Sequence, residues 1–155
     1  MVEVRPLAGE DVPLLARLVA GTPLWQRYGY SEARCAADLG AALAEGQDAL
    51  FAAGPPGAPR ALAWVLRRGA FGRAPYLKLL AVAEGDRGQG VGAALLAAAE
   101  AVGSELVLLV SDFNDRARAF YGRQGYLQVG ALADFVLPGV TELILRKVAT
   151  ARLRP

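Results

Sequence analysis

An apolar strand that leads into a glycine-rich turn and a helix is the feature that most constrains this chain. Leu79-Leu80-Ala81-Val82 is followed, after a short spacer, by Arg87-Gly88-Gln89-Gly90-Val91-Gly92, and a helical pattern continues from Ala93. A turn that opens a helix presents free backbone N–H groups and the positive end of the helix dipole. The glycines leave room for a phosphate and Arg87 adds positive charge, so the pattern predicts a pyrophosphate site.

One kind of protein with such a turn binds NAD(P). Gly88, Gly90 and Ala93 fit the G-x-G-x-x-G/A spacing, and Asp112 lies about 20 residues further on. That fingerprint normally follows its strand directly and begins the nucleotide-binding unit. Here residues 83–87 intervene and little sequence follows the turn, so NAD(P) binding is the weaker interpretation.

The remaining pattern alternates short apolar runs with helical periodicity. It predicts an α/β (α+β) fold, a mixed central sheet with helices on both faces, in one domain over 1–148 with a tail at 149–155. Strands are expected at 2–5, 49–53, 61–67, 76–83, 105–110, 127–132 and 142–146, and helices at 9–18, 31–46, 90–102 and 114–124. Gly69 to Pro75 is expected to be a connection, and the aromatic stretch 24–30 to interrupt the first two helices.

Composition excludes several classes of function. The 155 residues contain no histidine and only Cys35 as cysteine, which rules out histidine-based triads and histidine zinc sites, and no metal is expected. A net charge of +2 without a basic run argues against nucleic acid. No signal peptide and no apolar run of about 20 residues is visible, so we expect no membrane association and a cytoplasmic protein.

Two motifs carry a family resemblance. Arg87-x-x-Gly90-x-Gly92 resembles the Q/R-x-x-G-x-G/A signature of the GNAT acetyltransferases, and Asn114-x-x-Ala117-x-x-Phe120-Tyr121-x-x-x-Gly125-Tyr126 resembles the second motif of that family. Their separation and the order of elements also match, so the resemblance covers essentially the full chain. It implies acetyl-CoA as cosubstrate, with its pyrophosphate on the glycine turn (Arg87, Gly88, Gln89, Gly90, Val91, Gly92 and Ala93).

The resemblance also implies roles for individual residues. Leu80, Ala81 and Val82 would end the splayed central strand that pairs with the pantetheine arm, and a backbone N–H near Leu80 would bind the oxyanion. Asn114 would contact pantetheine or cap its helix. Tyr121 would hydrogen-bond or protonate the departing thiolate of CoA, since a phenol is a sufficient acid for a thiolate.

The acceptor and the base are less constrained. Trp25 and Tyr28, with carboxylates such as Glu84 and Asp112, suit a cationic amine of a small molecule or a peptide. The same aromatic residues equally fit a role in packing the helix corner. Neither carboxylate matches a known catalytic position, and a water relay is an equal alternative. The last hairpin is consistent with a homodimer interface, and a non-catalytic acyl-CoA-binding module is the alternative function.

Overall fold

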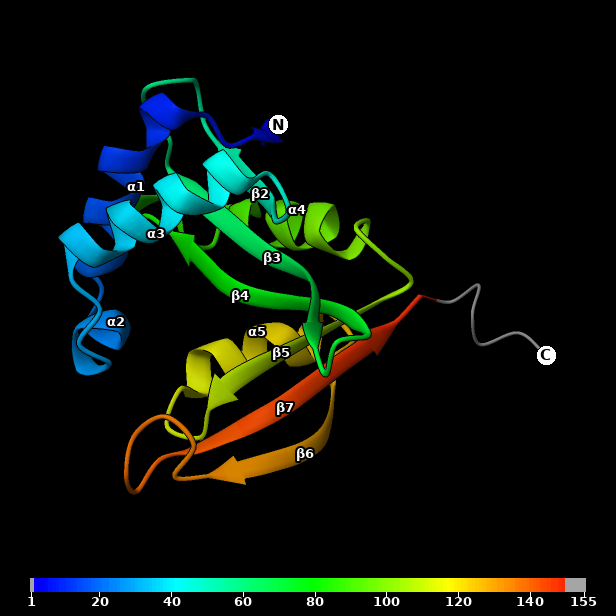
Figure 1. Cartoon of the computed structure of the whole chain (residues 1–155). Coiled ribbons are helices and arrows are strands. Elements are labelled where there is room, and N and C mark those ends of the chain that lie inside the picture. The colour runs from blue at the N-terminus through cyan, green and yellow to red at the C-terminus, as the bar shows by residue number, and fades with distance from the viewer. Residues whose placement is uncertain (1, 150–155) are drawn as a thin grey trace.

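Seven strands form one mixed sheet in the order β1-β2-β3-β4-β5-β7-β6 (Figure 1). The strands are β1 (Val4–Pro6), β2 (Ala49–Ala53), β3 (Ala61–Ala70), β4 (Ala74–Val82), β5 (Glu105–Ser111), β6 (Leu127–Ala133) and β7 (Thr141–Val148). All neighbours are antiparallel except β4 and β5, which are parallel. The computed structural model describes residues 2–149, so the predicted tail lies outside the described residues apart from Ala149.

Helices cover both faces of this sheet, as predicted. The helices are α1 (Val12–Ala20), α2 (Pro23–Arg27), α3 (Glu32–Glu45), α4 (Val91–Glu100) and α5 (Asp115–Arg123), with short 3₁₀ turns at Gly9–Asp11 and Glu84–Asp86. One apolar cluster lies under α1 and α3 and includes Leu15 and Leu39. The second lies under α4 and α5 and includes Leu95 and Tyr121. The sheet therefore has an apolar core on each side, because a sheet with two apolar faces must bury both.

Local sequence chemistry sets the helix ends where it was expected to. Ser31 accepts a hydrogen bond from the Arg34 N–H and begins α3, which ends at Gly46 with φ of +68°. Asn114 accepts from the Ala117 N–H and begins α5 in the same way. Short polar side chains satisfy the free N–H groups of a first turn, and glycine tolerates the left-handed cap.

Two local predictions were wrong. The expected connection from Gly69 to Pro75 is largely strand, since β3 runs to Ala70 and β4 starts at Ala74. Pairing between Ala70 and Ala74 overrides the turn signal and leaves a tight hairpin. The aromatic stretch also contains a helix, α2, which Thr22 caps and which Pro23 begins.

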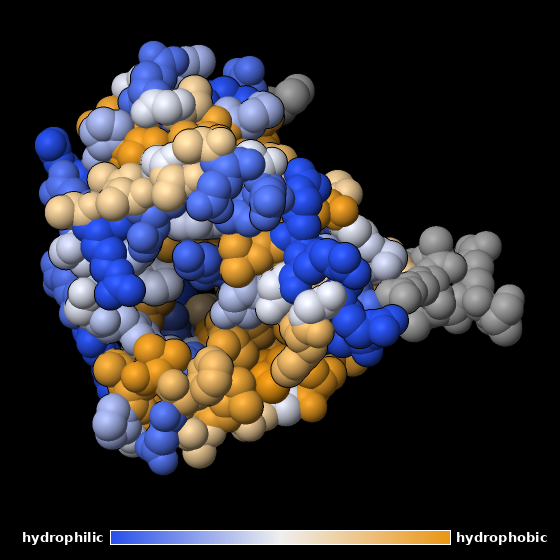
Figure 2. Space-filling view, in the orientation of Figure 1, coloured by the Kyte–Doolittle hydropathy of each residue, from blue (hydrophilic) through white to orange (hydrophobic). Residues whose placement is uncertain are grey.

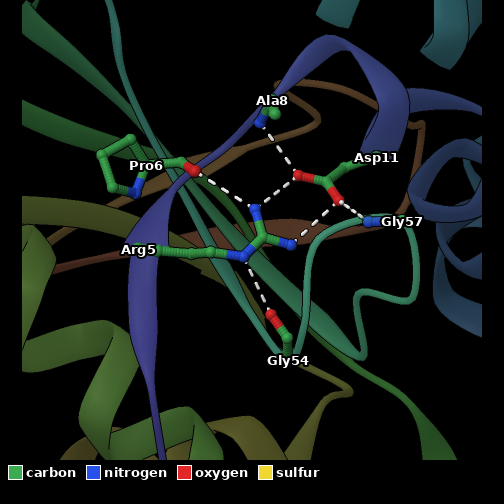
Figure 3. A network of polar contacts seen from close by, with 6 residues as sticks. All are labelled: Arg5, Pro6, Ala8, Asp11, Gly54 and Gly57. Carbon is green, nitrogen blue, oxygen red and sulfur yellow. Dashed lines mark hydrogen bonds and ion pairs between the residues drawn. The ribbon is translucent and has the colours of Figure 1, made fainter.

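A buried ion pair ties the first strand to the turn between β2 and β3. Both Asp11 carboxylate oxygens accept hydrogen bonds from Arg5, at 2.6 and 2.9 Å, and they also accept the N–H groups of Ala8 and Gly57 (Figure 3). Arg5 donates in addition to the Gly54 carbonyl. The Asp11 side chain is fully buried, and the Arg5 hydrogen bond holds its pKa below the usual range. Asp11 therefore stays ionised and fully paired.

Candidate functional site

The central strands β4 and β5 separate along their length. They pair only at Tyr76 with Val107 and at Leu77 with Leu108, although β4 continues to Val82. On its other edge β4 stays paired with β3 as far as Val82. One backbone edge of β4 beyond Leu77 therefore faces an opening in the sheet, and the gap between the two ribbons widens towards their carboxyl ends (Figure 1).

Side chains from both sides of this opening line a cleft of about 330 Å³. Figure 2 shows the surface hollowed between the helices and the part formed by β5, β6 and β7. The lining is mostly apolar and aromatic with a few polar groups, which is typical of a small-molecule site. It comprises Leu24, Trp25, Tyr28, Tyr76, Leu77, Lys78, Leu79, Leu80, Leu108, Leu109, Val110, Ser111, Asn114, Ala117, Tyr121, Val136 and Glu142.

The predicted phosphate turn lies directly after β4. Gly88 and Gly90 have φ of +76° and +82°, and a Cβ on either would meet no atom within 4 Å. Gly90 is also the N-cap of α4 and has no side chain to satisfy the first N–H groups. The turn therefore combines left-handed backbone that favours glycine, open space and a free helix N-terminus, which are the properties of an anion site.

At Gly92, glycine is needed for close packing, and not for the positive φ that requires it at Gly88 and Gly90. A Cβ at this position would lie 3.4 Å from the Phe120 ring, so Gly92 permits close packing of α4 on α5. Arg87 and Gln89 fold back on the turn and donate to the carbonyls of Val82 and Gly85. Val91 is buried beneath the turn and holds the start of α4 against the core.

Tyr121 extends from α5 into the cleft, where Leu80 of β4 also lies. Its side chain is buried, and burial raises the pKa of Tyr121 above its ordinary value. The phenol is therefore protonated at neutral pH and can donate a hydrogen bond. A raised pKa makes complete proton transfer from the phenol less favourable, so the geometry favours hydrogen-bond donation.

The other predicted site residues divide between the cleft and its surroundings. Trp25, Tyr28 and Asn114 line it, and the Trp25 ring also packs 5.6 Å from the ring of Tyr30. Ala81 points to the opposite face of β4, into the cluster under α1 and α3. Trp25 therefore lines the cleft and also packs the helix corner, so both interpretations of this residue agree with its position.

Glu84 and Asp112 are not among the residues that line the cleft. Glu84 lies at the edge of a second hollow of about 510 Å³, which Val82 and Arg87 also line beside α1. The Asp112 carboxylate accepts the N–H of Thr141 and so joins the end of β5 to the start of β7.

Sequence reasoning missed two polar residues of the cleft, Ser111 and Glu142. They are direct neighbours in the pairing of β5 with β7, and both are buried. The Tyr28 hydroxyl donates to Glu142 and also contacts Ser111. A glutamate directly before the apolar run Leu143-Ile144-Leu145 was the available signal, because an unpaired buried carboxylate is costly.

Among residues 2–149, no cluster of three or more histidine, cysteine, aspartate or glutamate side chains is suited to a metal ion. Within the same residues, none of the helices has the length and hydropathy needed to cross a bilayer.

Comparison with known proteins shows which family this chain resembles. Residues 59–128, which contain both motifs, match the sequence model of the acetyltransferase (GNAT) domain. No curated protein matches the chain. Among solved structures, a GNAT-family protein from Desulfovibrio desulfuricans is 23% identical with a TM-score of 0.78, over 96% of this chain and 99% of that one.

Two further structures of similar fold contain coenzyme A or acetyl-CoA. The PaiA N-acetyltransferase from Thermoplasma acidophilum, in complex with coenzyme A, is 16% identical, with a TM-score of 0.70 over 96% of this chain and 99% of that one. The yncA protein from Salmonella typhimurium, with acetyl-CoA, is 13% identical, with a TM-score of 0.74 over 100% and 98%. Because the sequence identities are this low, these structures show that the fold is shared and nothing more. The chain is therefore similar to the GNAT acetyltransferases in two respects: residues 59–128, with both motifs, match the sequence model of the domain, and the described chain shares the fold.

Proposed function

We propose that this protein transfers the acetyl group of acetyl-CoA to a primary amine, by direct attack of the amine within a ternary complex. The observation that carries the proposal is the continuity of three features. The open glycine turn follows the end of β4, the edge of β4 beyond Leu77 is not paired with β5, and Leu80 of β4 lines the cleft together with Tyr121. This path suits a long nucleotide thioester whose anionic end and reactive end are far apart.

Each part of the path has a distinct task. Backbone N–H groups at Gly88 to Gly92 would hold the pyrophosphate, with Arg87 beside them. The free edge of β4 would pair with the amides of pantetheine, and an N–H near Leu80 would stabilise the oxyanion. Tyr121 would donate a hydrogen bond to the sulfur as the C–S bond breaks. Asn114 both caps α5 and lines the cleft, so contact with pantetheine is compatible with its cap.

Direct attack is supported by the residues that surround the cleft. Cys35 is a buried residue of α3, and the residues that line the cleft include no cysteine. The Ser111 hydroxyl is a possible nucleophile of the cleft, and it is hydrogen-bonded to the Glu142 carboxylate at 3.3 Å. The chain contains no histidine that could activate it. We therefore expect no acetyl-enzyme intermediate.

Titration calorimetry with acetyl-CoA, CoA and NADH tests the nucleotide assignment. Binding of acetyl-CoA and CoA with no response to NADH is expected, and the reverse would contradict the proposal. Release of free thiol from acetyl-CoA across a panel of small amines and peptides then measures transfer. Binding without thiol release on any amine would favour the alternative, a non-catalytic acyl-CoA-binding module.

Tyr121→Phe tests the role of the phenol. We expect turnover to fall about 100-fold, the lower end for loss of a general acid, with acetyl-CoA affinity unchanged. Tyr126→Phe is the matched control, since the Tyr126 ring lies 5.6 Å from that of Tyr121 but its hydroxyl donates to Glu100, which does not line the cleft. Equal losses in the two variants would contradict the assignment.

Association into homodimers is part of the proposal. The edge strand β6 and the loop after it expose Leu127, Val129, Phe135 and Val136, and Figure 2 shows apolar residues gathered over this part of the molecule. Contiguous exposed apolar surface is typical of an interface. Light scattering in solution measures the mass directly.

A cytoplasmic location, where acetyl-CoA is made available, is the compartment that we propose.

A further inference from the structure

Glu142 occupies an unusual position in the cleft. It projects from β7 next to Ser111 of β5, and only 4% of its surface is exposed. Within residues 2–149, no ion pair involves Glu142. A carboxylate buried without a cation is expensive, and such a group is usually retained for a purpose other than stability.

In the part of the chain that the structure describes, the hydrogen bonds to this carboxylate come from neutral hydroxyls. The Ser111 hydroxyl lies 3.3 Å from each Glu142 oxygen, and the Tyr28 hydroxyl donates to Oε1. A carboxylate has about four acceptor positions, and these two groups supply only two protons. Glu142 therefore retains capacity for further donors, and the cleft is the direction from which they can come.

The walls around Glu142 are suited to a cation. Trp25, Tyr28 and Tyr76 are aromatic residues of the cleft. Lys78 also lines it, and its ammonium lies 3.9 Å from the Trp64 ring centre. Burial raises the pKa of Tyr28 and of Tyr76, so both remain neutral at physiological pH. An alkylammonium here would gain one charge partner and aromatic faces.

We infer that Glu142, oriented by Tyr28 and Ser111, binds the ammonium of the acceptor and takes its proton. This assignment rests on the proposed acetyl transfer and adds the acceptor site and the base to it. One proton passes from the ammonium to Glu142 and then to solvent. The neutral nitrogen forms a bond to the thioester carbon, the C–S bond breaks, and the second nitrogen proton ends on the sulfur, which Tyr121 hydrogen-bonds. The acceptor class is thus a primary ammonium with no anion beside the amine.

Benzylammonium is the probe for the binding half of this inference. In titrations of the CoA-saturated protein, we expect millimolar binding of benzylamine hydrochloride and no measurable binding of benzyl alcohol. Glu142→Gln should weaken benzylammonium at least tenfold. Glu100→Gln is the matched control, because Glu100 also accepts a tyrosine hydroxyl, that of Tyr126, but lies outside the cleft. Equal affinity in Glu142→Gln, or no preference of the wild type for the cation, would overturn the inference.

The pH profile of transfer tests the proton-accepting half. With Glu142→Gln, turnover at pH 7 should fall at least 100-fold and should recover towards pH 10, where the amine loses its proton without help. A merely structural role would lower turnover equally at all pH values. Tyr28 and Ser111 contact Glu142, and Tyr76, Lys78 and Asn114 line the same cleft. The pKa values of Tyr28 and Tyr76 are raised by burial, so both phenols stay largely protonated over this range.

Acetyl-CoA titration separates the two levels of the proposal. Glu142→Gln should bind acetyl-CoA as the wild type does, which also shows that it is folded. If wild type fails to bind acetyl-CoA, the proposed function fails. If acetyl-CoA binds but Glu142→Gln retains both benzylammonium affinity and the wild-type pH profile, only the inference about Glu142 fails. Should Glu142→Gln not fold, the wild type's discrimination between benzylammonium and benzyl alcohol decides.

Discussion

Two buried carboxylates of this protein have opposite surroundings. Asp11 is enclosed by the Arg5 guanidinium and two backbone N–H groups, so its charge is fully compensated. Glu142 is nearly as deeply buried, but within residues 2–149 its hydrogen bonds come from the hydroxyls of Tyr28 and Ser111 alone, at the side of an open cleft. The difference teaches that burial alone does not distinguish a structural acid from a functional one. What distinguishes them is whether the protein itself completes the charge.

Removal of Asp11 should give the largest effect on stability. Asp11→Ala leaves the Arg5 guanidinium buried without its partner, and we expect a loss of about 3–5 kcal/mol in the free energy of unfolding. Urea denaturation measures it, with Asp115→Ala, an exposed residue, as control. Arg5→Met combined with Asp11→Ala should recover part of the loss, because no charge is then left unpaired. Full additivity of the two single effects would contradict this account.

Replacing each carboxylate by the amide of the same shape should show most directly how much each one contributes to the free energy of unfolding. Asp11→Asn removes charge-assisted hydrogen bonds and should cost about 2–3 kcal/mol of unfolding free energy. Glu142→Gln keeps an acceptor for Tyr28 and loses no ion pair, so its stability should stay within about 1 kcal/mol of the wild type. Similar losses for the two variants in urea would show that Glu142 is as structural as Asp11.

The pH dependence of stability should carry the signature of Asp11. Its pKa is lowered in the folded protein, chiefly by the Arg5 hydrogen bond, from about 3.9 in an unfolded chain. The stabilisation is therefore complete well above pH 4 and is lost as the pH falls from there through the folded value. The stability difference between wild type and Asp11→Asn, from urea curves at pH 7 to pH 3, should be constant above about pH 5 and shrink below pH 4. A difference that grows on acidification would contradict the assignment.

Tyr28→Phe should give the smallest effect, and on catalysis only. Glu142 keeps its hydrogen bonds from Ser111 but loses one donor, so the efficiency of transfer to the acceptor should fall about fivefold, or roughly 1 kcal/mol. Steady-state kinetics with acetyl-CoA and the amine varied separately would show the change in the acceptor and not in acetyl-CoA. Tyr30→Phe is the comparison, since the Tyr30 hydroxyl donates to Asp38, which does not line the cleft.

Local features of the fold were predictable because short stretches of chain encode them. The caps at Ser31 and Asn114 and the left-handed glycines at 46 and 125 are local hydrogen-bond and backbone chemistry. The glycine turn after β4 was predictable for the same reason. The hairpin between Ala70 and Ala74 was not, since strand pairing there outweighed the glycine and proline signals.

The assembly of the cleft lay beyond such reasoning. Tyr28 and Glu142 are 114 residues apart and Ser111 lies between them in sequence, so no spacing rule connects the three. Pairing of β5 with β7 places Ser111 opposite Glu142, and α2 brings Tyr28 to the same point. Glu84 and Asp112 were plausible candidates by their position along the chain, but neither side chain reaches the lining.

The sequence by itself determined the order of the strands and of the longer helices, the apolar faces of the sheet, the glycine turn after β4 and the position of Tyr121 on its helix. Each depends on residue type and short spacing, which act through local backbone geometry and hydrophobic periodicity. Only the tertiary structure decided where β4 and β5 separate, and which carboxylate is left without a cation inside the opening. Those properties depend on strand register and on contacts between distant segments, and the free energy of such contacts is set by burial that exists only once the chain has folded.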